Sequence, residues 1–282
     1  MLKRIQLLFQ IIRVRDWAKN IVILLPLIFS GKVLSFKVEQ SSEILINISS
    51  FLLLTSIVYI LNDIKDIPQD ALNPHKNKRP IASGEVSVAY ALVIIICLFS
   101  GILINLFLFG FNFLEYYIFY LLNNIIYNFY LKKINIVNSL SIAFGFLIRL
   151  FFGAELSNVP LEPWLIVLVL LGTFLLSLIK KLSDKKNMIG VDKLLKQDYL
   201  FINSSIICMF IVYTIHFYFT VEFNIINQLI SSLLFVLTLL IIRRNIKKIT
   251  HSIDTFQIFS MDSNFMISLF IWFTHYYFCR YI

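Results

Sequence analysis

Apolar runs of about 20 residues, separated by short polar segments, follow one another along the whole chain. Runs of this length predict helices that cross a bilayer, because about 20 residues of α-helix span its hydrocarbon layer. The first and last runs are short, so the pattern supports eight or nine spans and we expect an all-α polytopic membrane bundle of about nine. The expected spans lie near residues 21–35, 44–61, 86–109, 114–130, 134–152, 161–179, 200–219, 225–242 and 265–278.

The N-terminal segment reads as a retained part of the protein. Arg13, Arg15 and Lys19 interrupt its apolar stretch, and no small-residue cleavage site follows, which argues against a signal peptide. We expect residues 1–20 to form an amphipathic helix at the membrane interface that leads into the first span. No low-complexity segment divides the chain, so residues 1–282 are expected to form a single transmembrane domain.

Composition and charge agree with this interpretation. Of the residues, 59% are hydrophobic and 15% charged, far from the composition of soluble globular domains. Of the 25 basic residues, 21 lie in the N-terminal segment or in loops after the second, fourth, sixth and eighth spans. By the positive-inside rule, these parts are cytoplasmic, which predicts a multi-pass inner-membrane protein with a cytoplasmic N-terminus.

An acidic segment follows the second span, where the chain reads Asn-Asp-Ile-Lys-Asp-Ile-Pro-Gln-Asp. Asp63, Asp66 and Asp70 are spaced so that a helix would project all three from one face, with Asn62 one turn before Asp66. Hard oxygen ligands at this spacing suit Mg²⁺, which keeps several waters and takes further oxygens from a substrate's phosphates. Pro68 disfavours a regular helix just before Asp70, so the Asp70 assignment is the weaker one.

The loop at residues 73–84 reads Asn-Pro-His-Lys-Asn-Lys-Arg-Pro-Ile-Ala-Ser-Gly and supplies Lys76, Lys78 and Arg79. Ammonium and guanidinium groups bind the phosphate oxygens that a metal leaves free. We expect Lys76 and Arg79 to bind substrate.

A second polar cluster ends the sixth span, where Lys180 and Lys181 precede Asp184 by four and three residues. One helical turn would therefore present two cations around a carboxylate. Four spans separate this cluster from the acidic segment, so both are expected at the cytoplasmic side, where a bundle could bring them together over one cavity.

Further polar residues are weaker candidates for the same cavity. Lys19 and Asn20, before the first span, could add an anion contact, and Tyr127 and Lys132, at the end of the fourth, could border the cavity. Arg149 lies inside the fifth span and is left out of the site, because it could equally reach the membrane surface or pair with a neighbouring carboxylate.

Taken together, the motif Asn-Asp-x-x-Asp-x-x-x-Asp, the basic loop and the Lys-Lys-x-x-Asp cluster resemble the UbiA superfamily of intramembrane prenyltransferases. Within it the chain is most similar to the decaprenyl-phosphate phosphoribosyltransferase branch. Arg13, Trp17 and the 146–153 segment support the resemblance, which extends over roughly residues 13–200.

The resemblance implies a helical bundle around a cytoplasm-facing cavity and Mg²⁺-dependent transfer of 5-phosphoribosyl from phosphoribosyl pyrophosphate to a polyprenyl phosphate such as decaprenyl phosphate. It implies a role in cell envelope biosynthesis, no nucleic-acid partner and a possible homo-oligomer. The chain departs from the branch at four positions, where other residues are usual: Val14, Asp16, Lys181 and Asp184. The implied metal ligands are Asn62, Asp63, Asp66 and Asp70; the catalytic residues Asp63, Asp66, Lys180 and Asp184; and the substrate-binding residues Lys19, Asn20, Lys76, Arg79, Tyr127, Lys132, Lys180, Lys181 and Asp184.

Two other functions remain open at this point. A prenyltransferase that moves a polyprenyl group from its diphosphate to an aromatic or quinone-precursor acceptor would share the first motif, but it would favour a doubly acidic second motif, which this chain lacks. A non-enzymatic carrier of polyprenyl-linked sugars would explain many spans and internal charge, but it would not need carboxylates at metal-binding spacing.

Overall fold

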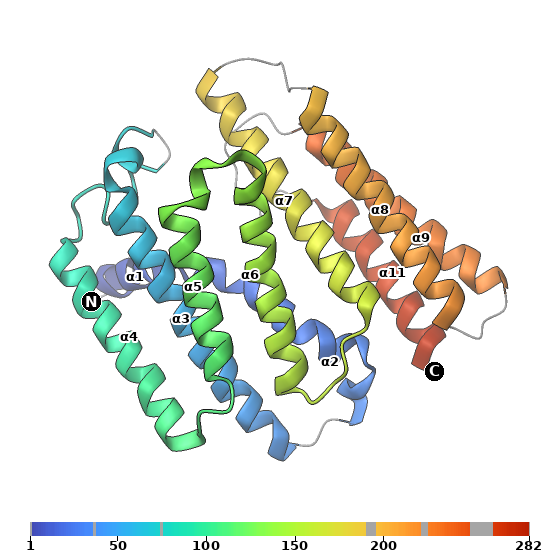
Figure 1. The fold of residues 1–282 in the computed structure, drawn as a ribbon, viewed down its shortest axis with the longest axis horizontal. Helices are drawn as coiled ribbons and strands as arrows, with labels where there is room; N and C mark the ends of the chain where they lie inside the picture. Colours follow the sequence, from blue (N-terminus) through green and yellow to red (C-terminus); the bar gives the residue numbers. More distant parts are fainter. Residues whose placement is uncertain are drawn as a thin grey trace. The chain divides into compact units, whose positions relative to one another are not determined.

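The computed structural model describes residues 2–35, 38–73, 76–189, 196–220, 225–248 and 262–281. These residues form ten α-helices and three short or irregular 3-10 segments, so the all-α expectation is confirmed (Figure 1). The α-helices are α1 (Leu2–Ile11), α2 (Leu25–Phe29), α3 (Val38–Ala71), α4 (Val88–Phe109), α5 (Leu114–Phe129), α6 (Asn135–Leu156), α7 (Pro163–Ile189), α8 (Lys196–Thr220), α9 (Ile225–Lys248) and α11 (Ser263–Tyr281). The 3-10 helices are η1 (Val14–Leu24), η2 (Lys32–Ser35) and η3 (Leu131–Lys133).

Six of the described helices are long and apolar enough to cross a membrane: α3, α4, α6, α7, α8 and α9. Their surfaces agree with a lipid environment, since α4 exposes Ile96, Ile104 and Phe107 among other large apolar side chains. The multi-pass expectation is therefore confirmed for these six. Of the other three expected spans, the one at 114–130 corresponds to α5, which has only 16 residues, and the one at 265–278 lies within α11.

The first expected span and the expected interfacial helix are wrong in their boundaries. Helix α1 ends at Ile11, and Arg13 adopts a left-handed conformation (φ 52°, ψ 50°) before the chain continues as η1. A second break follows, because Pro26 lies in the first turn of α2, which has only five residues. Hydropathy alone does not reveal the second break, since the apolar run continues through Pro26.

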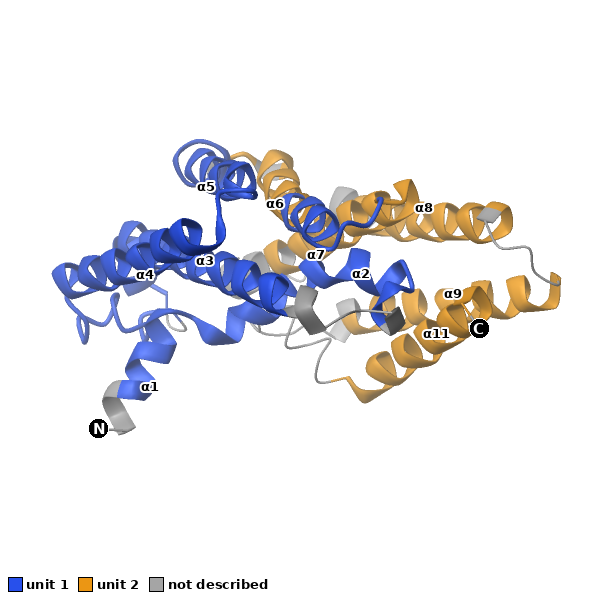
Figure 2. Cartoon of the chain, turned by 90° about the horizontal axis from the view of Figure 1, so that it is seen from below, with its two compact units in different colours: residues 1–133, 148–160 blue, residues 134–147, 161–282 orange. Residues whose placement is uncertain are grey.

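The chain divides into two compact units (Figure 2). Unit 1 comprises residues 1–133 and 148–160, and unit 2 comprises residues 134–147 and 161–282. Whether residues 1–282 act as a single domain stays a prediction.

Unit 1 has an aromatic core where α3, α5 and α6 meet. The rings of Phe51 and Phe152 stack with centroids 5.0 Å apart, and Tyr117 and Tyr120 pack against Phe51. Phe51 and Phe152 are completely buried. Such aromatic packing fixes the relative positions of the helices that carry the polar residues described below.

Unit 2 is built on neighbouring helices α7, α8, α9 and α11, with its own aromatic core. Tyr213 of α8 packs against Phe235 of α9 with ring centroids 4.3 Å apart, and Trp272 and Tyr276 of α11 complete the group. The Lys180 and Lys181 cluster belongs to this unit, on α7.

Candidate functional site

The acidic segment forms the last turns of α3, which runs without a break to Ala71 with Pro68 inside it. At about 100° per residue, Asn62, Asp63, Asp66 and Asp70 occupy an arc of about 100° on the helix surface. The predicted shared face is therefore confirmed for these positions, and Pro68 does not remove Asp70 from it.

Asp63 and Asp70 form one ionic cluster with two arginines. Arg13 donates from Nε to Asp63 Oδ2 at 3.0 Å and from a second guanidinium nitrogen to Asp63 Oδ1. Arg79 donates from Nη1 to Asp63 Oδ1 at 3.0 Å and to Asp70 Oδ2 at 2.5 Å. Both carboxylates are buried, at 6% and 3% exposure, so these cations stabilise charges that are largely removed from solvent.

The basic loop is folded so that Arg79 reaches back to α3. The Ser83 N–H donates to the Arg79 carbonyl at 2.8 Å, and the Val86 N–H donates to the Pro80 carbonyl at 2.8 Å. Gly84 lies between them with φ +77°, a left-handed conformation that glycine adopts without strain. These hydrogen bonds and the turn at Gly84 fix the backbone on the C-terminal side of Arg79, whose side chain contacts Asp63 and Asp70.

Asp66 and Asn62 contact the end of α5 and the η3 turn that follows it. Lys132 Nζ lies 2.6 Å from Asp66 Oδ1 and 2.5 Å from Oδ2. The Asn128 side-chain amide donates to Asn62 Oδ1, and Lys65 donates to the Asn128 backbone carbonyl. Lys132 was expected to border the cavity; the structure shows it on Asp66, and its role at a cavity stays a prediction.

The N-terminal η1 segment adds a further charged group. Lys19 Nζ pairs with Asp16 Oδ1 at 2.5 Å, and both Lys19 and Arg13 lie over the Tyr59 ring, at 5.9 Å and 5.3 Å from its centroid. Burial lowers the pKa of the Arg13 guanidinium, but the carboxylates of Asp63 and Asp16 outweigh it and hold that pKa above its ordinary value. Arg13 is therefore a permanent cation at this site.

Asn20 is placed differently from the sequence expectation. It is buried, with 4% exposure, and its Oδ1 accepts a hydrogen bond from Arg149 Nε at 2.7 Å. Arg149 also donates to the Tyr120 hydroxyl at 2.8 Å. In this structure Asn20 binds another side chain of unit 1.

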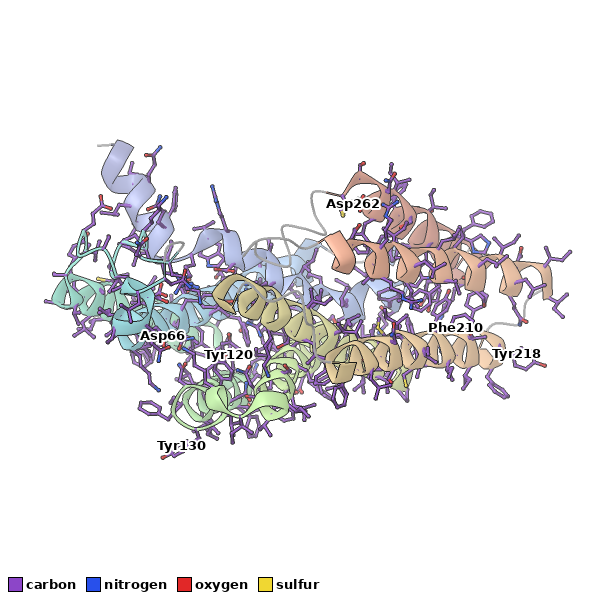
Figure 3. The ribbon with its side chains drawn as sticks, turned by 90° about the horizontal axis from the view of Figure 1, so that it is seen from above. Asp66, Tyr120, Tyr130, Phe210, Tyr218 and Asp262 are labelled. Carbon is purple, nitrogen blue, oxygen red and sulfur yellow. The ribbon has the colours of Figure 1, made fainter. Side chains whose placement is uncertain are left out.

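The remaining candidates in unit 1 lie around this region. The backbone N–H of Lys76 donates to Asn73 Oδ1 at 3.3 Å in the basic loop, and the Lys76 side chain is half-buried. Tyr127 is half-buried on the last turns of α5, whereas Tyr130, which caps that helix, is 72% exposed and points away from it (Figure 3).

The second polar cluster lies in unit 2. Lys180 is exposed and Lys181 is half-buried on α7, and the Asp184 side chain lies outside the described residues. Because the two clusters belong to different units, their meeting over one cavity stays a prediction.

The side chains of α3 fit a magnesium ion by their chemistry. Asn62, Asp63 and Asp66 offer amide and carboxylate oxygens, the hard ligands that Mg²⁺ takes. Among the described residues, no three His, Cys, Asp or Glu side chains are grouped so that they could hold a metal ion together. Mg²⁺ usually binds through one or two carboxylates and completes its shell with water and substrate phosphates.

Sequence reasoning did not place Arg13 and Arg149 at the site. Arg13 and Asp63 are 50 residues apart, and Arg149 and Asn20 are 129 apart, so no local spacing could have paired them. The sequence did offer one signal for Arg149: a charged residue within an apolar span usually faces the protein interior and has a buried polar partner there.

Comparisons with known proteins agree with this fold. The model of the UbiA prenyltransferase family matches residues 24–254. Over nearly the whole length of both chains, the fold is similar to two solved structures: a UbiA homolog from Archaeoglobus fulgidus bound to GPP and Mg²⁺ (TM-score 0.66, 12% identity, 97% and 99% covered) and a digeranylgeranylglyceryl phosphate synthase (TM-score 0.63, 16% identity, 98% of each covered).

Two of the similar sequences carry the same description. The chain is 29% identical over 175 residues to the decaprenyl-phosphate phosphoribosyltransferase of Mycobacterium tuberculosis. The matched region covers 61% of this chain and 58% of the relative. The chain is 27% identical over 181 residues to the protein of the same description from Mycolicibacterium smegmatis, covering 63% and 56%. The chain thus matches a little more than half the length of these curated relatives.

Proposed function

Because the chain belongs to the UbiA prenyltransferase family and is a transferase of that family, we propose that it transfers 5-phosphoribosyl from phosphoribosyl pyrophosphate to a polyprenyl phosphate, with release of diphosphate. The similarity to two decaprenyl-phosphate phosphoribosyltransferases supports this choice of substrates. The observation that carries it is the meeting of Arg13 and Arg79 on Asp63, since paired guanidinium groups are suited to bidentate binding of phosphate oxygens.

Within unit 1 the charges at the site are nearly balanced. The cations are Arg13, Lys19, Lys65, Arg79 and Lys132, and the carboxylates are Asp16, Asp63, Asp66 and Asp70. A diphosphate arriving with a divalent cation would exchange partners with these groups: its oxygens would replace carboxylates on the arginines and lysines. Such an exchange keeps every buried charge paired as substrate binds.

Asn62, Asp63 and Asp66 would hold Mg²⁺, with Asp70 as a further ligand or as the partner that keeps Arg79 in place. Bound Mg²⁺ supplies neutralisation of the diphosphate charge as that group departs. Arg79 now contacts Asp63, and Lys132 contacts Asp66. Both cations are therefore positioned to bind the phosphate oxygens that the metal does not contact.

The reaction exchanges one carbon–oxygen bond for another. The bond between the sugar C1 and diphosphate breaks with its electron pair leaving on diphosphate, and an oxygen of the lipid phosphate forms the new bond to C1 from the opposite face. A lipid phosphate is already anionic near neutral pH, so no general base is required. Catalysis would rest on orientation and on electrostatic stabilisation of the leaving group.

The second cluster supports a donor that carries more charge than one diphosphate. Lys180 and Lys181 on α7 supply two cations where the sequence offers one carboxylate, Asp184. A sugar with an additional 5-phosphate matches that balance, and we place this phosphate at Lys180 and Lys181. The N-terminus and both clusters would face the cytoplasm, so a water-soluble donor would reach them from that side.

The test is direct transfer of label. The purified protein in lipid nanodiscs is incubated with Mg²⁺, a polyprenyl phosphate and phosphoribosyl pyrophosphate labelled in the sugar, and label is counted in the organic phase, with EDTA in a parallel sample. We expect Mg²⁺-dependent labelled lipid. The matched variants are Asp66→Ala, at the site, and Glu85→Ala, which removes an exposed carboxylate from the end of the basic loop.

Failure of transfer is informative if other substrates are offered. Activity with a prenyl diphosphate and an aromatic acid, in place of phosphoribosyl transfer, would assign the chain to the aromatic prenyltransferases. Movement of polyprenyl-linked sugars across the bilayer that is insensitive to Mg²⁺ and to Asp63→Asn would identify a carrier.

A further inference from the structure

The backbone of η1 is unusual because it remains 3-10 helical for 11 residues, Val14–Leu24. Runs of 3-10 helix longer than three or four residues are uncommon, since their hydrogen bonds are poorly aligned and side chains three apart eclipse one another. A segment of this length is not expected to keep its form unaided. The contacts that hold it should therefore lie outside the segment.

Helix α6 makes two such contacts, both from one face. Arg149 Nε donates to Asn20 Oδ1 at 2.7 Å. Gly153 meets the backbone at Ile23 so closely that a Cβ on Gly153 would lie 1.8 Å from the Ile23 carbonyl oxygen. Asn20 and Ile23 are three residues apart, one turn of a 3-10 helix, and Arg149 and Gly153 are four apart, about one turn of an α-helix.

Arg149 is itself firmly held. Its side chain is buried, with 4% exposure, and its second hydrogen bond goes to the Tyr120 hydroxyl of α5 at 2.8 Å. The guanidinium carbon lies 4.6 Å from the centroid of the Tyr120 ring and 5.8 Å from that of Phe51. Asn20 thus binds a cation that the aromatic core of unit 1 fixes in place.

At its other end η1 begins beside the ionic cluster. Arg13, which precedes it, has the left-handed conformation (φ 52°) and binds Asp63. In the middle, Trp17 Nε1 donates to Ser56 Oγ at 2.9 Å. A non-glycine residue in this conformation persists only where its surroundings hold it.

The helix type sets where Arg13 lies relative to Asn20. Seven residues separate them, and each residue of α-helix rises about 0.5 Å less and turns about 20° less than one of 3-10 helix. Conversion to α-helix would shorten this stretch by about 3.5 Å and rotate one end against the other by about 140°. With Asn20 on Arg149, Arg13 would then no longer reach Asp63.

We propose that Arg149 and Gly153 form a clamp that holds η1 in its 3-10 form, and that Arg149 is a positioning residue that, through Asn20, places Arg13 on Asp63. The clamp is a property of unit 1 alone. Only its effect on turnover rests on the function proposed above.

Hydrogen exchange of the full-length protein in nanodiscs tests the clamp without any activity. In Arg149→Met and in Gly153→Ala, we expect amides of residues 16–24 to exchange at least tenfold faster, with α4 unchanged. Gly101→Ala is the control, because its added Cβ meets only the Leu53 side chain at 3.4 Å. Unchanged exchange in η1, or equal acceleration in α4 and η1, would overturn the clamp.

Conservative variants separate the clamp from a general loss of folding. Asn20→Asp keeps an oxygen for Arg149 and should keep slow exchange in η1, whereas Asn20→Leu, of similar size, should not. Equal exchange in these two variants would also overturn the proposal.

The transfer assay then measures the consequence for the site. In Arg149→Lys, turnover should fall about a hundredfold, the size expected when a charged group is misplaced by about 1 Å, while the KM for the lipid stays unchanged. If wild-type protein transfers no phosphoribosyl, the function proposed above fails while the exchange result still decides the clamp.

Discussion

Arg13 and Asp63 form an ion pair with two hydrogen bonds across 50 residues of sequence, and the Asp63 carboxylate also accepts from Arg79. One buried carboxylate is thus shared by a guanidinium from the N-terminal segment and one from the basic loop. Removal of either cation leaves Asp63 with the other, whereas removal of Asp63 leaves two guanidinium groups without this partner. Substitution of Asp63 should therefore reduce turnover and stability more than substitution of Arg13 or Arg79.

Arg13→Ala should lower turnover about tenfold to a hundredfold and destabilise the fold by about 1–3 kcal/mol, because Asp63 loses charge-assisted hydrogen bonds but keeps Arg79. Asp63→Ala should cost more in both measurements. Arg15→Ala, which removes an exposed cation two residues further on, is the control. Transfer rates and thermal unfolding of the purified variants check this, and an Arg13 variant that matches the Arg15 variant would contradict it.

Asp66→Ala should lower Mg²⁺-dependent turnover about a hundredfold or more, as expected for loss of a catalytic electrostatic contact. A magnesium titration shows whether the lost turnover comes from loss of a metal ligand, because loss of a ligand raises the Mg²⁺ concentration needed for half-maximal activity. Lys132→Ala, which removes the cation that contacts the same carboxylate, should leave that concentration unchanged or lower it. If Asp66→Ala stays within a few fold of wild type, Asp66 is not a ligand.

Lys180→Ala should raise the KM for phosphoribosyl pyrophosphate about tenfold, equivalent to about 1.4 kcal/mol of lost binding, with the KM for the lipid unchanged. Arg243→Ala provides the comparison, since it removes an exposed cation from α9 of the same unit. Steady-state kinetics with each substrate varied in turn measure both constants. An effect confined to the lipid would reverse the proposed orientation of the substrates.

Much of the site's chemistry was predictable because it is local. Asp63, Asp66 and Asp70 share a helix face by spacing alone, and Arg79 follows within the same stretch of chain. The α3 helix nevertheless continues ten residues beyond the apolar run predicted to end at Leu61. Hydropathy marks where the apolar part of a helix ends, but here the helix continues beyond it, and its carboxylates there pair with Arg13, Arg79 and Lys132 from other segments.

The rest depended on tertiary contacts that sequence patterns do not encode. Hydropathy over 21–35 predicted one span, whereas the contact between Gly153 and Ile23 accompanies a 3-10 segment there. A period of 3.0 rather than 3.6 residues is difficult to recognise where nearly every residue is apolar. Arg149 was left out of the predicted site because local sequence does not indicate its partner, Asn20, which lies 129 residues away.

A polar cluster in unit 2 gives a prediction independent of the proposed function. Arg280 of α11 binds Glu162, before α7, with one hydrogen bond of 3.2 Å and a second, shorter one, and it contacts His216 of α8 at 3.1 Å. The Trp164 ring stacks on the His216 ring with centroids 4.2 Å apart. Glu162 and Arg280 therefore tie three helices together at one end of the unit.

Glu162→Gln and Arg280→Ala should each lower the thermal unfolding temperature by several degrees, because each weakens a hydrogen-bonded ion pair that is partly removed from solvent. The double variant should lose little more than the single variants, since either change already breaks the pair, giving a coupling energy of about 1 kcal/mol. Glu115→Gln, which neutralises an exposed carboxylate on α5, should have no effect. Unfolding measured in nanodiscs provides the four values of the cycle, and additive losses would mean that Glu162 and Arg280 stabilise unit 2 independently of each other.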